Sequence, residues 1–283
     1  MNREAGTAVD PKVELSYIRA IELVFESIPG TVLQLAALIH AKEVDSVAYF
    51  ALVSSVITAT SMSAYMSWDW DIDKGKRKEM PYFYGYIPKK SLARKAIVAI
   101  ALFVCSVCCL LARYLICVCL AQKGLDVVAA VLASEMPNYF VAKAFVGDFV
   151  YWAQKYGVAG YTLSFLDRFT TKVLIDWTFF VQGRIPTEVG GVGFCWSLLC
   201  TAVIGLASAT TTDEIQGPFE KATIMNTMIG SCISLLVSFT VLLCSIDQNY
   251  LETFISTKTG NVYIKEYFTK NEEDEKEDND SCL

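Results

Sequence analysis

Two acidic side chains near the start of the chain could carry chemistry inside a membrane. Glu22 and Glu26 are four residues apart in an otherwise apolar stretch, so both carboxylates lie on one face of a helix. Pro29 and Gly30 follow; the proline frees a backbone carbonyl, and the glycine allows a neighbouring helix to approach closely. A kinked helix with stacked acids, which could share one proton, is typical of an ion or headgroup pathway. The alternative is a helix along the membrane surface, with both acids in water.

An arginine lies within the apolar stretch 96–122. Arg113 interrupts a cysteine-rich run, and an unpaired guanidinium there would be costly, so we expect it to pair with an acid on another helix. The candidate partners are Glu26, Glu135 and Asp148. The alternative is that Arg113 extends towards the outer membrane surface, because its segment ends by about residue 122.

A further group of charges lies between residues 161 and 182. At helical spacing Arg168, Lys172 and Asp176 share a stripe, with Asp167 at its edge. We favour a buried, mutually compensating network over an amphipathic helix on the membrane surface. The predicted lipid or ion pathway comprises Glu22, Glu26, Pro29, Gln34, Arg113, Asp167, Arg168, Lys172 and Asp176.

The sequence does not favour metal or nucleophilic chemistry. Five of the ten cysteines lie in one apolar run: Cys105, Cys108, Cys109, Cys117 and Cys119. One helix cannot close a tetrahedral site, so we expect these thiols to pack as small apolar groups. The single histidine, His40, has no evident nucleophile nearby. The glycine-rich run at 190–193 is expected to serve helix packing rather than phosphate binding. We expect neither a cofactor nor a metal, and no enzymatic activity.

Composition indicates the setting of these residues. The chain has 283 residues, of which 54% are hydrophobic and 19% charged, with a mean hydropathy of +0.40. Soluble domains have about a quarter charged residues, so an integral, multi-pass membrane protein is indicated, with the plasma membrane favoured over internal membranes. The net charge of -6 comes from the acidic segment 271–283, and the rest, being neutral, offers no basic surface for nucleic acid. The expected partners are membrane lipids and, where the charges bind another helix, a partner membrane protein.

The fold class that we expect is all-α, a polytopic bundle of six to eight hydrophobic helices, some kinked or partly spanning. Segments 47–68, 189–212 and 222–246 have no charge over the roughly 20 residues that a spanning helix needs, and 96–122 has only Arg113. Each mid-membrane charge costs about 2.5–3.5 kcal/mol, so three further segments can cross only inside a bundle. These three are 18–39, 125–146 and 161–182.

The flanking regions set the predicted orientation. Residues 69–95 hold eight basic residues, which places this loop, and with it the N-terminal segment 1–17, in the cytoplasm. Its bases and aromatic residues should lie against the anionic cytoplasmic leaflet. The membrane bundle is predicted to occupy 18–246. The C-terminal region 247–283 is polar, and its acidic tail at 271–283 is predicted to be disordered. Six or eight crossings would place this region in the cytoplasm, which we favour, and seven would place it on the opposite side of the membrane.

One stretch resembles a known family. From Glu26 to Leu35 the sequence reads ESIPGTVLQL, and it is followed by a short polar link, a serine-rich span ending in Ser67-Trp68, a basic loop and an arginine-flanked apolar helix. This order resembles the XK-related membrane proteins, whose pattern is an acid, a small residue, Pro and then Leu-Gln. The match covers about residues 18–122. Family members usually have further membrane helices before the motif, so the resemblance implies a divergent and shortened relative.

That resemblance implies movement of phospholipids between leaflets without nucleotide hydrolysis, in some members switched on by cleavage of the C-terminal tail. When the family's motif is compared residue by residue, the resemblance assigns a role only to Glu26, Pro29 and Gln34. Lipid movement needs a polar track that a headgroup can follow while its tails stay in lipid. Two alternatives stay open: a solute or ion transporter or channel, and a non-transporting membrane subunit of a larger complex.

Overall fold

The described part of the chain is helical and contains several helices long enough to cross a membrane. The computed structural model describes residues 11–41, 43, 45–74, 85–89, 91–121, 123–146, 157–170, 199–200, 203–207, 210 and 221–246. Within these ranges every regular element is a helix. Four segments are long and apolar enough to span a bilayer: Ile18–Ile39, Ser46–Ile72, Leu92–Ala121 and Ala222–Ser245. The protein is therefore a multi-pass integral membrane protein.

Three of the four nearly charge-free segments are confirmed as helices long and apolar enough to span a membrane. They form α3 (Ser46–Ile72), α5 (Leu92–Ala121) and α10 (Lys221–Ser245). Most of the fourth, 189–212, lies outside the described residues. The predicted count of six to eight helices is not confirmed, since the described part of the chain holds four candidate spans.

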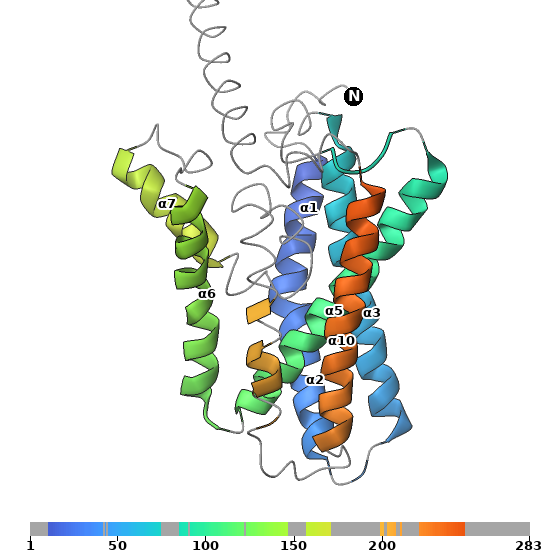
Figure 1. Ribbon diagram of the computed structural model, residues 1–283, viewed down its shortest axis with the longest axis vertical. Helices are drawn as coiled ribbons and strands as arrows, with labels where there is room; N and C mark the ends of the chain where they lie inside the picture. Colours follow the sequence, from blue (N-terminus) through green and yellow to red (C-terminus); the bar gives the residue numbers. More distant parts are fainter. Residues whose placement is uncertain are drawn as a thin grey trace, which may run out of the picture.

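The first span is a broken helix, as Pro29 predicts. It consists of α1 (Pro11–Glu22), a π-helical turn η1 (Leu23–Ser27) and α2 (Ile28–His40), which run on from one another (Figure 1). In the turn, the N–H of Ile28 donates to the carbonyl of Leu23, and Pro29 has no N–H to give. The regular α pattern is therefore interrupted at Leu23–Ser27, two to six residues before Pro29, without ending the span.

Two helices do not meet the length or polarity of a span. Helix α6 (Leu125–Val146) has the predicted bounds, but it contains three charged residues and Pro137. Helix α7 (Gly157–Thr170) begins four residues before the predicted segment 161–182 and has 14 residues, about 21 Å, short of the roughly 30 Å of hydrocarbon. Residues 171–182 lie outside the described part.

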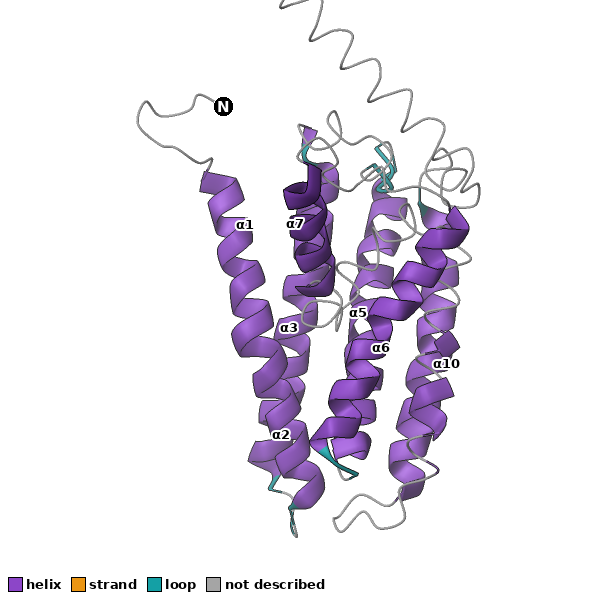
Figure 2. Ribbon diagram, turned by 90° about the vertical axis from the view of Figure 1, so that its left-hand side faces the viewer, coloured by secondary structure: helices purple, strands orange, loops and turns teal. Residues whose placement is uncertain are grey.

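Helix α5 is the centre of the packing. It contacts α2, α3, α6 and α10, and Figure 2 shows it among the other long helices. Every residue from Ala112 to Leu120 on α5 is buried, as expected for a helix that is apolar on all sides. One core cluster joins Leu110 and Tyr114 to Leu23 and Met228, and a second joins the first half of α5 to the end of α10.

Candidate functional site

Four of the predicted pathway residues lie on the exposed side of the first span. Glu22, Glu26, Pro29 and Gln34, here called the polar stripe, are all exposed. The other side of the same span is buried against α3 and α5, through Leu23, Ile28, Thr31, Leu35 and Leu38. From Glu22 to Gln34 the stripe extends about 18 Å, more than half of the hydrocarbon thickness.

The polar stripe has apolar neighbours on the same surface. Ile21 is 57% exposed and Phe25 and Leu33 are each 70% exposed, so the surface alternates carboxylate and apolar side chains. Neither Glu22 nor Glu26 forms an ion pair with another described residue. Charged groups left open at this depth attract water, cations or lipid headgroups, because hydrocarbon cannot solvate them.

Behind the polar stripe, the break is held to α5 by a buried tyrosine. The Tyr114 hydroxyl donates to the carbonyl oxygen of Ile28 at 3.3 Å, and Thr31 donates to the carbonyl of Ser27 at 2.7 Å. Both side chains are completely buried. The expectation that Gly30 admits a close neighbour is wrong: an added Cβ would meet nothing within 4 Å. A hydroxyl rather than a glycine therefore connects the break to the neighbouring helix.

Replacing Tyr114 tests that connection. We expect Tyr114→Phe to keep the ring packing and lower the free energy of unfolding by about 0.5–1 kcal/mol, the usual contribution of one interhelical hydrogen bond. The midpoint of unfolding in a denaturing detergent titration measures it. Tyr65→Phe is the control, because Tyr65 is half exposed and its ring contact with Arg19 needs no hydroxyl. An equal loss in both variants would contradict the assignment.

A cation–π contact fixes the other end of the broken span. The guanidinium carbon of Arg19 lies 4.8 Å from the centre of the Tyr65 ring, which joins α1 to α3 three residues before Glu22. Sequence patterns did not single out this pair, because nothing in the spacing of two residues 46 positions apart signals a contact.

Arg113 is buried in the core rather than near the polar stripe. Only 6% of its surface is exposed, and it lies in the stretch Ala112–Leu120 of α5, in which every residue is buried. Burial favours the paired alternative over extension to the membrane surface. Glu26 is exposed and is not its partner among the described residues. The side chain of Glu135, like Asp148 as a whole, lies outside the described part, so an acidic partner there stays a prediction.

The second predicted charge cluster is only partly described. The backbones of Asp167 and Arg168 lie in α7, but their side chains, together with Lys172 and Asp176, are outside the described residues. The buried network predicted for these four residues stays a prediction.

The five cysteines of α5 are buried in the two core clusters, as their packing role predicts. Cys105, Cys108 and Cys109 lie in the cluster with Tyr86, and Cys117 and Cys119 in the other. All five are free thiols. Within the described ranges, no three His, Cys, Asp or Glu side chains come together as metal ligands do.

A polar site that sequence reasoning missed lies where α3 ends. The Asp71 carboxylate is completely buried and accepts the N–H groups of Gly85, Tyr86 and Ile87, at 2.5, 3.2 and 3.0 Å. The Tyr86 hydroxyl donates to the carbonyl of Ser67 at 3.1 Å. We call these four hydrogen bonds the Asp71 clamp. The alternation of Trp and Asp at 68–73 and the glycine at 85 are its only traces in the sequence.

Comparison of the chain with models of protein families, with curated proteins and with solved structures found no match. The fold thus defines the class, a multi-pass integral membrane protein with an all-α fold. The resemblance to the XK-related proteins is carried by its sequence motif alone.

Proposed function

We propose that this protein moves phospholipids between the leaflets of a membrane, the plasma membrane in the first instance, without nucleotide hydrolysis. The observation that carries the proposal is the exposed position of the polar stripe on a broken spanning helix. A headgroup that crosses while its tails remain in lipid needs polar groups on the lipid-facing surface. Glu22 and Glu26 offer carboxylates to the cationic part of a headgroup, and Gln34 continues the path beyond the break. The proposal also makes the chain a divergent relative of the XK-related proteins.

The exposed position of the polar stripe supports lipid movement more than it supports a solute or ion channel. A solute or ion channel needs its charges around an enclosed aqueous path, whereas the side chains of Glu22 and Glu26 are both exposed. A non-transporting subunit would use the polar stripe to bind a helix of another protein. That alternative is an outcome of the test below, since an occupied stripe would not move lipid.

The test is dithionite quenching of fluorescent phospholipid in liposomes that contain the purified full chain. Protein-free liposomes lose about half of the signal, and we expect the protein to extend the loss well beyond half. Glu22→Gln/Glu26→Gln should slow the second phase about tenfold, which corresponds to about 1.4 kcal/mol of lost barrier lowering. Glu14→Gln/Glu43→Gln is the matched control, because it removes two exposed carboxylates that lie outside the span.

Three results would count against the proposal. A wild-type signal that stops at half would show that this chain alone does not move lipid, and capture of a partner membrane protein would then favour the subunit. An unchanged rate in Glu22→Gln/Glu26→Gln would remove the polar stripe from the pathway. Conductance across planar bilayers without lipid movement would favour the transporter or channel.

A further inference from the structure

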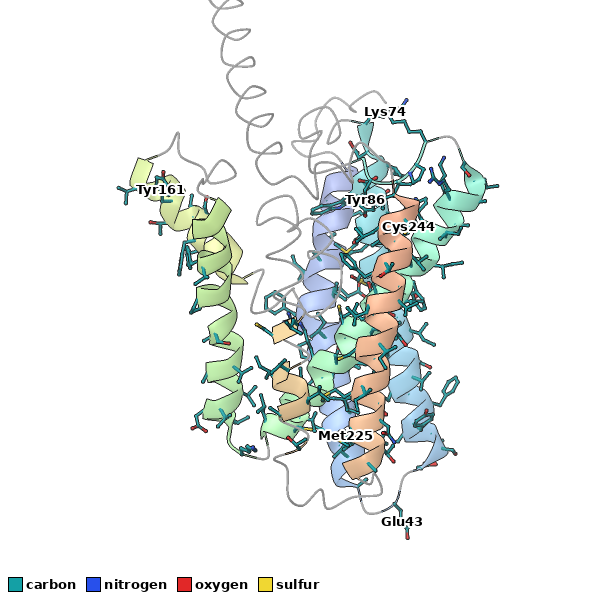
Figure 3. The ribbon with its side chains drawn as sticks, in the orientation of Figure 1. Glu43, Lys74, Tyr86, Tyr161, Met225 and Cys244 are labelled. Carbon is teal, nitrogen blue, oxygen red and sulfur yellow. The ribbon has the colours of Figure 1, made fainter. Side chains whose placement is uncertain are left out.

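The Asp71 clamp joins the basic loop to the end of the helix bundle. Gly85–Lys89 is the described part of that loop before α5, and its Tyr86 and Ile87 are buried against Leu102, Phe239 and Leu242. Figure 3 shows Tyr86 and Lys74 at one end of the molecule and Glu43 at the other. A segment that is anchored by four hydrogen bonds and two buried side chains has a fixed position relative to α3 and α5.

The lengths of α3 and α5 and the residues at the end that carries the Asp71 clamp place this end in the headgroup region. Helix α3 has 27 residues and α5 has 30, so they are about 40 and 45 Å long, against about 30 Å of hydrocarbon and 40–45 Å of bilayer with its headgroups. The excess length belongs at this end, because the last turn of α3 carries Asp69 and Asp71 and the first turn of α5 carries Arg94 and Lys95, which hydrocarbon cannot solvate. Trp68 and Trp70, both half-buried in that last turn, are residues typical of this level.

Among the described residues of 69–95, the exposed charges are all basic. Four basic residues flank the start of α5, namely Lys89, Lys90, Arg94 and Lys95, and no acid occurs from residue 80 to residue 125. Lys89 and Arg94 are exposed, as is Lys74 at the end of α3. The acids nearby are less exposed: Asp69 and Asp73 are half-buried. The Asp71 carboxylate is buried and accepts hydrogen bonds from three N–H groups. Leu92, 83% exposed among these bases, can enter the lipid.

We propose that the exposed bases around the start of α5 form a binding surface for anionic phospholipid headgroups, with Lys89 positioned by the Asp71 clamp and Arg94 by α5 itself. The surface lies on the side that the basic loop assigns to the cytoplasm, where anionic lipids are concentrated. The clamp contributes by pre-organisation: the bases sit at headgroup depth before any lipid binds. This surface is separate from the polar stripe and does not depend on lipid movement.

Tryptophan quenching measures the preference. The full chain, with Trp152, Trp177 and Trp196 changed to Phe, is placed in nanodiscs with brominated phosphatidylserine or brominated phosphatidylcholine. Trp68 and Trp70 then report lipid at this end only. We expect the wild-type surface to favour phosphatidylserine at least tenfold. Lys89→Gln/Arg94→Gln should lose most of this preference, since each base near an anionic surface contributes about fivefold.

Two further variants separate charge from position. Lys42→Gln/Lys123→Gln removes one base that precedes α3 in the sequence and one that follows α5, and should leave the preference unchanged. Asp71→Asn retains every base but weakens the clamp, so the preference should fall about threefold or more. Tyr86→Phe, which removes only the bond to Ser67, serves if Asp71→Asn does not fold, and should lower the preference in the same direction.

Three results would overturn the proposal. Equal quenching by both lipids in the wild type would remove the surface altogether. A loss in Lys42→Gln/Lys123→Gln as large as that in Lys89→Gln/Arg94→Gln would show a general charge effect. A preference that survives weakening of the clamp, in folded Asp71→Asn or in Tyr86→Phe, would show that the clamp does not position the bases.

Discussion

Asp71→Ala is expected to lower the free energy of unfolding by about 3 kcal/mol or more. The substitution leaves the N–H groups of Gly85, Tyr86 and Ile87 without their acceptor, two of them in fully buried residues, and each unsatisfied group costs about 1–3 kcal/mol. Removal of a buried carboxylate recovers part of this loss, and water that enters the end of the bundle recovers more. Unfolding in a denaturing detergent titration gives the magnitude.

Hydrogen exchange locates the effect of this substitution. Amide protection of Gly85, Tyr86 and Ile87 should drop to that of an open loop, while amides in the middle of α5 should change little. Asp69→Ala is the control, since Asp69 lies on the same turn of α3 and takes no part in the clamp. If Asp69→Ala destabilises as much as Asp71→Ala, the loss comes from the helix end and not from the three hydrogen bonds.

Two glycine substitutions in the membrane are expected to have opposite effects. A Cβ on Gly205 would lie 2.7 Å from the Sδ of Met228 and 3.2 Å from the side chain of Ile116, and Met228 is completely buried. Gly205→Ala should therefore cost about 1–3 kcal/mol through overpacking between α5 and α10. Gly230 on α10 is exposed with nothing within 4 Å of an added Cβ, so Gly230→Ala should be neutral or stabilise by up to about 1 kcal/mol.

The two variants control each other, because both add one methyl group to a helical glycine. Their unfolding midpoints, measured in the same detergent, should move in opposite directions or differ by at least 1 kcal/mol. Equal shifts would indicate that residues 203–207 do not pack against Met228 as the structure places them.

The helices that could be predicted from the sequence are those whose signal is local. Runs with no charge, or with Arg113 alone, predicted α3, α5 and α10, since twenty apolar residues have few other stable states in a bilayer. Pro29 predicted the break in the first span, because a missing N–H acts within one turn. The number of spans could not be predicted, since α6 with three charges and the short α7 depend on what surrounds them and not on their own hydropathy.

For the candidate sites, the residue types were more predictable than their surroundings. Glu22 and Glu26 share a surface, as spacing predicts, but no periodicity shows whether that surface faces a neighbouring helix or the outside. Tyr114 and Asp71 were missed for a related reason. Their partners, Ile28 and Gly85–Ile87, are 86 and 14–16 residues away, and such contacts exist only after the helices have packed.

Because of the π-helical turn at Leu23–Ser27, the number of residues in the first span can change without a change in the directions of its side chains. Five residues of the turn advance the chain around the axis about as far as four residues of a regular helix. Deletion of one apolar residue from this turn would leave a regular helix that is one residue shorter and has the same polar side chains. The four remaining residues would rotate the chain about the helix axis as far as the five do now, so Glu22 and Gln34 would keep their present directions. The chain can therefore lose one residue in this turn without a change in which side chains of the span are exposed.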